Sequence, residues 1–215
     1  MKAFNIYTLP HTGTRFAFSF LKHLGFKRTQ VDGRVEEPEL FDNDVTYSQF
    51  HAKWMLHYNE VGLYIASTSG ERKTLTTLQD PKWWAVSWLS RRLSNEEGEI
   101  CWTTYLREIE KMDIVYLDIR CPEEYRKTHL ISILKQLDVY DGKYDTLIDE
   151  FVSSMWVKVG SKETSYHKIF RETGQFKHHP DTLNELTLDL LPYEDWYYDK
   201  LDHLESNGYD IPNSK

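Results

Sequence analysis

The sequence predicts a single α/β domain over residues 1–215, with three layers: a mostly parallel central sheet and helices on both faces. The first observation is that strand-like runs alternate with helical segments, which is typical of parallel sheets covered on both sides. The predicted strands lie near 3–8, 45–50, 74–79 and 113–119, and the predicted helices near 13–24, 82–93, 102–111 and 122–137. The second observation is the length of the chain. A chain of 215 residues can bury a large core, and sheet folds of this length commonly do not divide into separate domains.

The first predicted strand leads into a turn that is suited to hold an anion. It runs from Asn5 towards Pro10, and a helix is expected to follow from about Gly13. Thr12, Gly13 and Thr14 have little side-chain bulk, so their backbone N–H groups can converge on phosphate oxygens, and the first helical turn adds unpaired donors. An ordinary tight turn prefers the same small polar residues. Both interpretations therefore stay open at this point.

A second strand, turn and helix are predicted between Thr74 and Arg92. The strand is apolar and β-branched, the turn is Asp80-Pro81, and Pro81 stands near the start of the helix, where proline is tolerated. In a parallel sheet both turns leave the carboxyl edge. Residues that are far apart in the sequence are therefore expected to meet there over one ligand.

Three further segments complete the expected order of elements. Tyr47 to His51 is an alternating run that ends in a histidine, and Asp113 to Ile119 has the pattern of a buried strand. Pro122 to Leu137 follows as a helical segment, and Leu191 to Leu204 is predicted to be a late amphipathic helix whose main role is packing. None of these segments by itself specifies a chemical function.

Composition excludes several classes of protein. An aromatic fraction of 14% and a hydrophobic fraction of 40% indicate a folded globule and argue against a disordered chain. The net charge of −8 argues against a nucleic-acid partner, because such a surface normally needs a basic patch. The same charge opposes a polyanionic ligand at long range. Because salt screens charges over about 8–10 Å, binding of such a ligand depends on cations near the site.

The chain is expected to be soluble and cytoplasmic. No segment approaches the roughly 18 apolar residues that a membrane helix needs, and the N-terminus lacks a basic region followed by an apolar run. Cys101 and Cys121 cannot form a disulfide framework and lack the spacing of a metal site, so reduced thiols are expected. No membrane partner and no metal are predicted.

Two motifs together resemble the sulfotransferases that use PAPS (3′-phosphoadenosine 5′-phosphosulfate) as the donor. Pro10-His11-Thr12-Gly13-Thr14 resembles the Pro-Lys-Ser/Thr-Gly-Thr phosphosulfate loop of that family. The family also has Arg-Asn/Asp-Pro at the end of a strand and a serine eight residues after the arginine, both holding the 3′-phosphate. This chain has Gln79-Asp80-Pro81 and then Ser87 at that spacing. Both motifs occur in the family's order, each at a strand-to-helix turn.

The resemblance implies a P-loop sulfotransferase-like fold, PAPS as the donor, PAP as the product and no required metal. The position of His51 on its strand looks like that of the catalytic base in the carbohydrate-acting branch, with His57 as the runner-up. The implied acceptor is a hydroxyl of a carbohydrate or other small molecule, with an amine less favoured. Animal enzymes of that branch are membrane-anchored, so the absence of an anchor suggests a microbial or phage member.

The resemblance also implies a role for each site residue. Thr12 to Arg15 would grip the 5′-phosphosulfate, with Pro10 opening the loop, and Gln79 and Ser87 would hold the 3′-phosphate. A basic loop over 157–162, with Lys158 and Lys162, would close over the donor.

Two positions depart from the family pattern. His11 stands where the family has a lysine that assists the leaving phosphate, and a protonated imidazole would restore the charge and the donor. Gln79 replaces the arginine that pairs with the 3′-phosphate, and it brings neither charge nor a bidentate fork. The cations expected to compensate are Arg91, Arg92, Lys158 and Lys162. The alternatives are a donor without the 3′-phosphate and a chain that has lost catalysis.

Two alternative functions stay open. A degenerate P-loop kinase or nucleotide hydrolase would bind ATP with magnesium, but the chain lacks Gly-Lys-Ser/Thr after the first strand, and Asp118 is the acid that such an enzyme would have to use. A non-catalytic module of the same fold would bind PAP without transferring sulfate. The substitutions at His11 and Gln79 motivate this second alternative.

Overall fold

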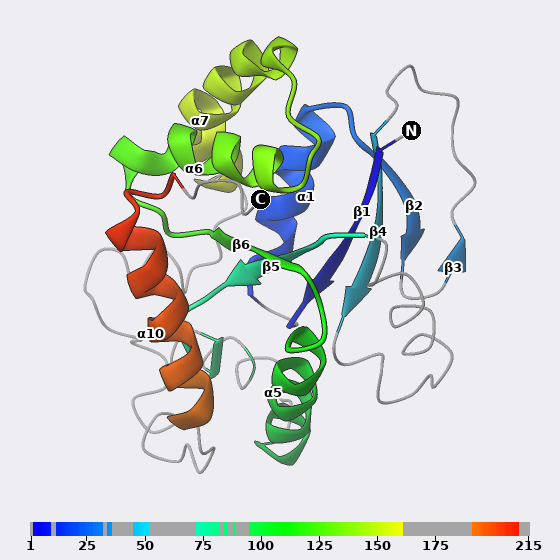
Figure 1. The fold of residues 1–215 in the computed structure, drawn as a ribbon, viewed down its shortest axis with the longest axis vertical. Coiled ribbons are helices and arrows are strands. Elements are labelled where there is room, and N and C mark those ends of the chain that lie inside the picture. The colour runs from blue at the N-terminus through cyan, green and yellow to red at the C-terminus, as the bar shows by residue number, and fades with distance from the viewer. Residues whose placement is uncertain are drawn as a thin grey trace.

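A computed structural model of the chain describes residues 2–9, 12–31, 34–35, 45–51, 72–81, 84–85, 88, 95–160 and 191–210. It shows a mixed α/β fold (Figure 1). The strands are β1 (Lys2–Thr8), β2 (Lys27–Val31), β3 (Arg34–Val35), β4 (Val45–His51), β5 (Thr74–Leu78) and β6 (Ile114–Asp118). The helices are α1 (Thr14–His23), α5 (Asn95–Ile109), α6 (Glu123–Gln136), the short 3-10 helix η1 (Gly142–Tyr144), α7 (Asp145–Gly160) and α10 (Leu191–Ser206).

The strands form one sheet in the order β3-β2-β4-β1-β5-β6. β1 pairs in parallel with β4 on one side and with β5 on the other, and the β2–β4 and β5–β6 pairs are also parallel. The two-residue β3 is antiparallel to β2 at one edge. The prediction of a mostly parallel sheet is therefore confirmed for the described strands.

Successive residues of β1 contribute to different hydrophobic clusters. Phe4 and Ile6 belong to a cluster that also contains buried side chains of α1, α6 and α7. Tyr7, one residue further on, stacks on Tyr105 of α5 and lies in a second cluster with Trp84 and Trp88. Because neighbouring side chains of a strand point to opposite faces, the two groups of helices pack on opposite sides of β1.

Most predicted elements are present, with shifted ends. The four predicted strands correspond to β1, β4, β5 and β6, and the segment from Pro122 to Leu137 is α6, with these two residues as its caps. The predicted helix at 102–111 begins earlier, at Asn95. The helix predicted at 82–93 is described only at Trp84, Ala85 and Trp88, which are helical.

The sequence analysis missed β2, β3 and α7, and its prediction of a loop over 157–162 is wrong for residues 157–160. β2 reads Lys-Arg-Thr-Gln-Val, and this polar composition hides a strand that parallel pairing with β4 stabilises. Residues 157–160 form the last turn of α7. Lys158 therefore lies on a helix, while Lys162 lies outside the described residues. Among the described helices, none is long and apolar enough to cross a membrane.

Candidate functional site

The sheet changes its direction of winding between β1 and β5. From β1 the chain passes through α1 to β2, beyond β4, whereas from β5 it passes through α5 to β6 on the other side. β1 and β5 are neighbours, so their outgoing connections diverge (Figure 1). In open parallel α/β sheets, ligands bind outside the carboxyl ends of the strands at such a switch point. The two turns singled out in the sequence follow these two strands.

The turn after β1 is held by threonine hydroxyls. Thr12 is fully buried; its Oγ1 donates to the carbonyl oxygen of Leu9 at 2.6 Å and lies 2.7 Å from the Oγ1 of Thr77 in β5. The hydroxyls of Thr8 and Thr14 are 3.0 Å apart, which connects the end of β1 to the start of α1. These hydroxyls shape the turn, and the backbone N–H groups of Thr12 and Phe16 donate to the carbonyl oxygens of Leu9 and Gly13. The backbone N–H groups between them are the donors that the turn can offer to a ligand.

Gly13 gives α1 an N-terminus that no side chain caps. Its φ of +86° lies in the left-handed region, which glycine adopts without strain. A Cβ atom at this position would overlap the Cδ1 of Ile119 and would lie 3.0 Å from its Cγ2. The backbone N–H groups of an uncapped first turn, together with the helix dipole, favour an anion.

The turn after β5 is fixed from the C-terminal helix. The hydroxyl of Tyr193 in α10 donates to the carbonyl oxygen of Gln79 at 3.1 Å, and Tyr193 is fully buried. The Gln79 Oε1 atom is buried and has no hydrogen-bond partner among the residues that the structure describes. The backbone of Gln79 is therefore held in place, while its side chain keeps an unused acceptor atom.

Removing the Tyr193 hydroxyl should loosen this turn. We expect Tyr193→Phe to lower the free energy of unfolding by about 1 kcal/mol, because the Gln79 carbonyl loses a partly buried hydrogen bond. Tyr198→Phe on the same helix is the matched control, since Tyr198 is 44% exposed and its substitution should change stability by less than about 0.5 kcal/mol. Urea denaturation of both variants measures the difference. Equal effects would show that the Tyr193 hydroxyl does not hold the turn.

The end of β6 carries a buried polar cluster. Asp118 Oδ1 accepts from the backbone N–H of Arg120 at 2.8 Å, and Oδ2 accepts from the Tyr209 hydroxyl at 3.0 Å. The backbone N–H of Asp118 donates to His129 Nε2 at 3.0 Å. Burial raises the pKa of the Asp118 carboxyl. Both carboxylate oxygens thus hold the local fold, which leaves Asp118 poorly placed as the magnesium ligand of a kinase-like enzyme.

Lys158 lies on a helix that approaches the same edge. Tyr144, just before α7, packs against Phe26 at the amino edge of the sheet, with ring centroids 5.3 Å apart. Further along α7, Phe151 packs against Phe16 in the first turns of α1 at 5.6 Å. α7 therefore runs antiparallel to α1. Its residue 158 lies about two turns beyond Phe151, towards the N-terminus of α1.

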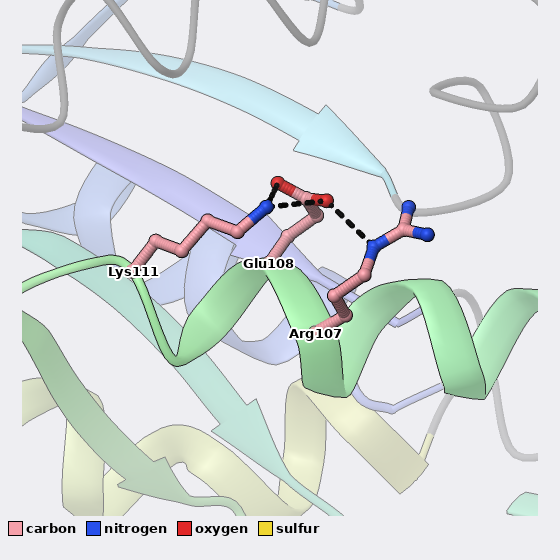
Figure 2. A network of polar contacts seen from close by, with 3 residues as sticks. All are labelled: Arg107, Glu108 and Lys111. Atoms are coloured by element: carbon pink, nitrogen blue, oxygen red, sulfur yellow. Dashed lines mark hydrogen bonds and ion pairs between the residues drawn. The ribbon is translucent and has the colours of Figure 1, made fainter.

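His51 is the last residue of β4 and pairs with Thr8 of β1, so its backbone lies at the carboxyl edge next to the first turn. Figures 1 and 2 show this end of β4 beside the last turns of α5. There Glu108 accepts from Arg107 Nε at 3.0 Å and from Lys111 Nζ at 3.1 Å. Charged side chains at the end of α5 thus lie beside the end of β4.

The structure brings together most of the predicted site that it describes. Thr12, Gly13, Thr14 and Gln79 lie at the carboxyl edge of β1 and β5. The backbones of Arg15, His51 and Lys158 are described without their side chains, and Pro10, His11, Ser87, Lys162 and the alternatives His57, Arg91 and Arg92 lie outside the described residues. Sequence reasoning missed Arg120 and Tyr193. The position of Arg120, directly after a buried strand, was the signal that could have identified it.

Comparison with family models, curated proteins and solved structures finds no match for this chain. The likeness to sulfotransferases therefore rests on the two motifs, their order and their spacing. What the structure adds is the position of the two motif-bearing turns at one edge of the sheet.

Proposed function

We propose that the chain is a PAPS-dependent sulfotransferase with a three-layer P-loop fold, acting on a hydroxyl of a carbohydrate or another small molecule. The meeting of the two motif-bearing turns carries this proposal. The hydroxyls of Thr12 and Thr77 are 2.7 Å apart, so the turn after β1 is bonded directly to the strand that leads to Gln79. Two ligand-binding turns this close fit a nucleotide with phosphates at both ends of its ribose.

The described residues fit such a donor. The uncapped N-terminus of α1 offers backbone donors to the 5′-phosphosulfate, and the absence of a Cβ at Gly13 lets the chain pass closely against Ile119. At the other end of the nucleotide, the Nε2 of Gln79 is the side-chain group that we assign as a donor to the 3′-phosphate. Arg15 and Lys158 stand on the elements that flank the first turn, so they are the cations assigned to the phosphosulfate.

The proposed reaction moves one sulfuryl group between two oxygen atoms. The acceptor oxygen attacks the sulfur and forms a new S–O bond, while the bond from sulfur to the bridging oxygen of PAPS breaks and PAP leaves. His51 takes the acceptor proton, for which an imidazole with a pKa near 6.5 is suited at neutral pH. His11, when protonated, donates to the departing oxygen. Holding the reactants in line and stabilising the leaving charge supply most of the catalysis, and the proposal includes no metal.

The cysteines agree with a reducing compartment, and we place the enzyme in the cytoplasm of a microbial or phage-infected cell. Cys101 and Cys121 are both buried thiols. Burial raises the pKa of the Cys121 thiol to about 12, so this side chain is inert at neutral pH.

Binding of PAP, the spent donor, tests the proposal directly. At 100 times its dissociation constant, PAP should add about 2.7 kcal/mol to the free energy of unfolding. For a domain of this size that corresponds to a rise of roughly 5–10 °C in Tm. Thermal unfolding with PAP, with ATP plus magnesium and without ligand measures the effect. A Tm that PAP leaves unchanged would contradict the proposal.

Transfer of labelled sulfate from PAPS to a panel of sugars, phenols and amines then separates an enzyme from a binding module. Transfer that falls in His51→Ala supports the assigned base. Binding of PAP with no transfer to any acceptor indicates the non-catalytic alternative. Stabilisation by ATP and magnesium, without an effect of PAP, indicates the kinase-like alternative.

A further inference from the structure

Arg120 is a cation at the carboxyl edge of the sheet that no motif identifies. It stands two residues beyond β6, and β6 pairs with β5 in the register Leu78 to Asp118. Continuing that register by two residues places Arg120 beside Asp80, in the turn that carries Gln79. The Arg120 side chain is exposed, so a ligand at this edge can reach it.

The backbone of Arg120 is held in a defined position. Its N–H donates to Asp118 Oδ1 at 2.8 Å, and Asp118 is itself buried and bonded to the Tyr209 hydroxyl. The N–H of Cys121 also donates to the carbonyl oxygen of Asp118. The base of the Arg120 side chain is therefore fixed before any ligand binds, which reduces the entropy lost on binding.

Ionisable side chains lie near the Arg120 guanidinium. Partial burial lowers its pKa, and the charges of Asp80, Tyr197 and Asp118 oppose this shift. Ile119, the preceding residue, lies against Gly13 at the N-terminus of α1. Arg120 therefore follows a residue that contacts the first turn, and the β5–β6 register places it beside Asp80 of the second turn. A guanidinium has five N–H donors in a planar fork, a geometry that suits the oxygens of a phosphate.

We infer that Arg120 binds the 3′-phosphate of the donor, in the place of the arginine that Gln79 replaces. This inference rests on the proposed function. A 3′-phosphate monoester is close to a dianion, which the neutral amide of Gln79 cannot balance, whereas a guanidinium binds phosphate through two parallel hydrogen bonds. The ligand class is a nucleoside 3′,5′-bisphosphate. The positively charged group thus comes from the turn that follows β6, the strand paired with β5, and not from the end of β5 itself.

Isothermal titration calorimetry with two nucleotides tests the assignment. PAP carries both phosphates, and 5′-AMP lacks only the 3′-phosphate. We expect Arg120→Gln to weaken PAP binding about tenfold to a hundredfold, as the loss of a hydrogen-bonded charge pair predicts, and to leave 5′-AMP binding within about twofold. Arg120→Lys should fall between Arg120→Gln and the wild type, because it keeps the charge and loses the fork.

Arg72→Gln is the matched control. Arg72 precedes β5 at the amino edge of the sheet, and its substitution changes the net charge by the same amount. It should leave both affinities unchanged. Thermal unfolding without ligand confirms that each variant is folded. If Arg120→Gln does not fold, Arg120→Lys takes its place in the comparison with the wild type.

The outcomes separate this inference from the proposed function. Wild-type protein that binds neither nucleotide overturns the proposed function and the inference with it. Wild-type protein that prefers PAP over 5′-AMP, with Arg120→Gln keeping that preference, overturns the role of Arg120 alone. Equal weakening of both nucleotides by Arg120→Gln also overturns it, because Arg120 would then not recognise the 3′-phosphate.

Discussion

Gly13→Ala is expected to abolish PAP binding and to lower the free energy of unfolding by about 2–5 kcal/mol. A non-glycine residue held at a φ of +86° costs about 1–2 kcal/mol. Overlap of the new Cβ with the Ile119 side chain adds about 1–3 kcal/mol if the core does not relax. Relaxation would displace the N-terminus of α1, where the phosphosulfate is proposed to bind. Urea denaturation and calorimetric titration with PAP measure the two effects.

Gly142→Ala provides the control for Gly13→Ala. A Cβ at Gly142 meets no atom within 4 Å. The free energy of unfolding of this variant should therefore lie within about 0.5 kcal/mol of the wild-type value, and PAP should bind with wild-type affinity. Adding Ile119→Ala to Gly13→Ala removes the overlap but not the backbone strain, and should restore PAP binding only in part. Wild-type affinity for PAP in Gly13→Ala itself would show that the left-handed turn is not needed.

The protein is expected to lose about 3 kcal/mol of stability through His129 as the pH falls from 6.5 to about 4. His129 is 1% exposed, and burial lowers its pKa from 6.5 to about 4. In this range the unfolded chain binds a proton that the folded protein does not, so acid favours unfolding. The magnitude follows from about 1.4 kcal/mol per pKa unit. Urea unfolding at a series of pH values measures the slope.

His129→Gln separates the loss of stability caused by His129 from that caused by other groups that titrate at acidic pH. Gln offers an oxygen to the Asp118 N–H that His129 Nε2 now accepts, and it does not titrate, so the pH dependence assigned to His129 should disappear. Asp118 acts in the opposite direction, because burial raises its pKa and its protonation stabilises the folded form. His203→Gln on the exposed face of α10 is the control. An unchanged slope in His129→Gln would refute the assignment.

Local patterns predicted the elements that lie around the candidate site. Runs of apolar residues identified β1, β5 and β6, and the small residues before Thr14 identified the start of α1. These signals are strong because each depends on residues within one turn or one strand. α7 and β2 were missed for a different reason. Their stability comes from partners distant in the sequence, such as Phe16 for Phe151 of α7 and the strand β4 for β2.

The candidate site was predictable to the extent that it follows motifs. The turns at Thr12 to Thr14 and at Gln79 were identified from the sequence, and the structure places them together. Arg120 and Tyr193 carry no motif. Their relevance depends on the β5–β6 register and on the contact of α10 with Gln79, both of which arise only when the chain is folded.

The sequence by itself determined that two small turns follow parallel strands and are suited to anions, because backbone geometry and side-chain bulk are local properties. Only the tertiary structure decided that these turns meet, since strand order is set by pairing between residues far apart in the chain. It also decided what each polar group can do. The hydroxyl of Thr12 is committed to the fold by its bonds to Leu9 and Thr77, while the backbone of the exposed Arg120 is held at the carboxyl edge of β6 by its bond to Asp118.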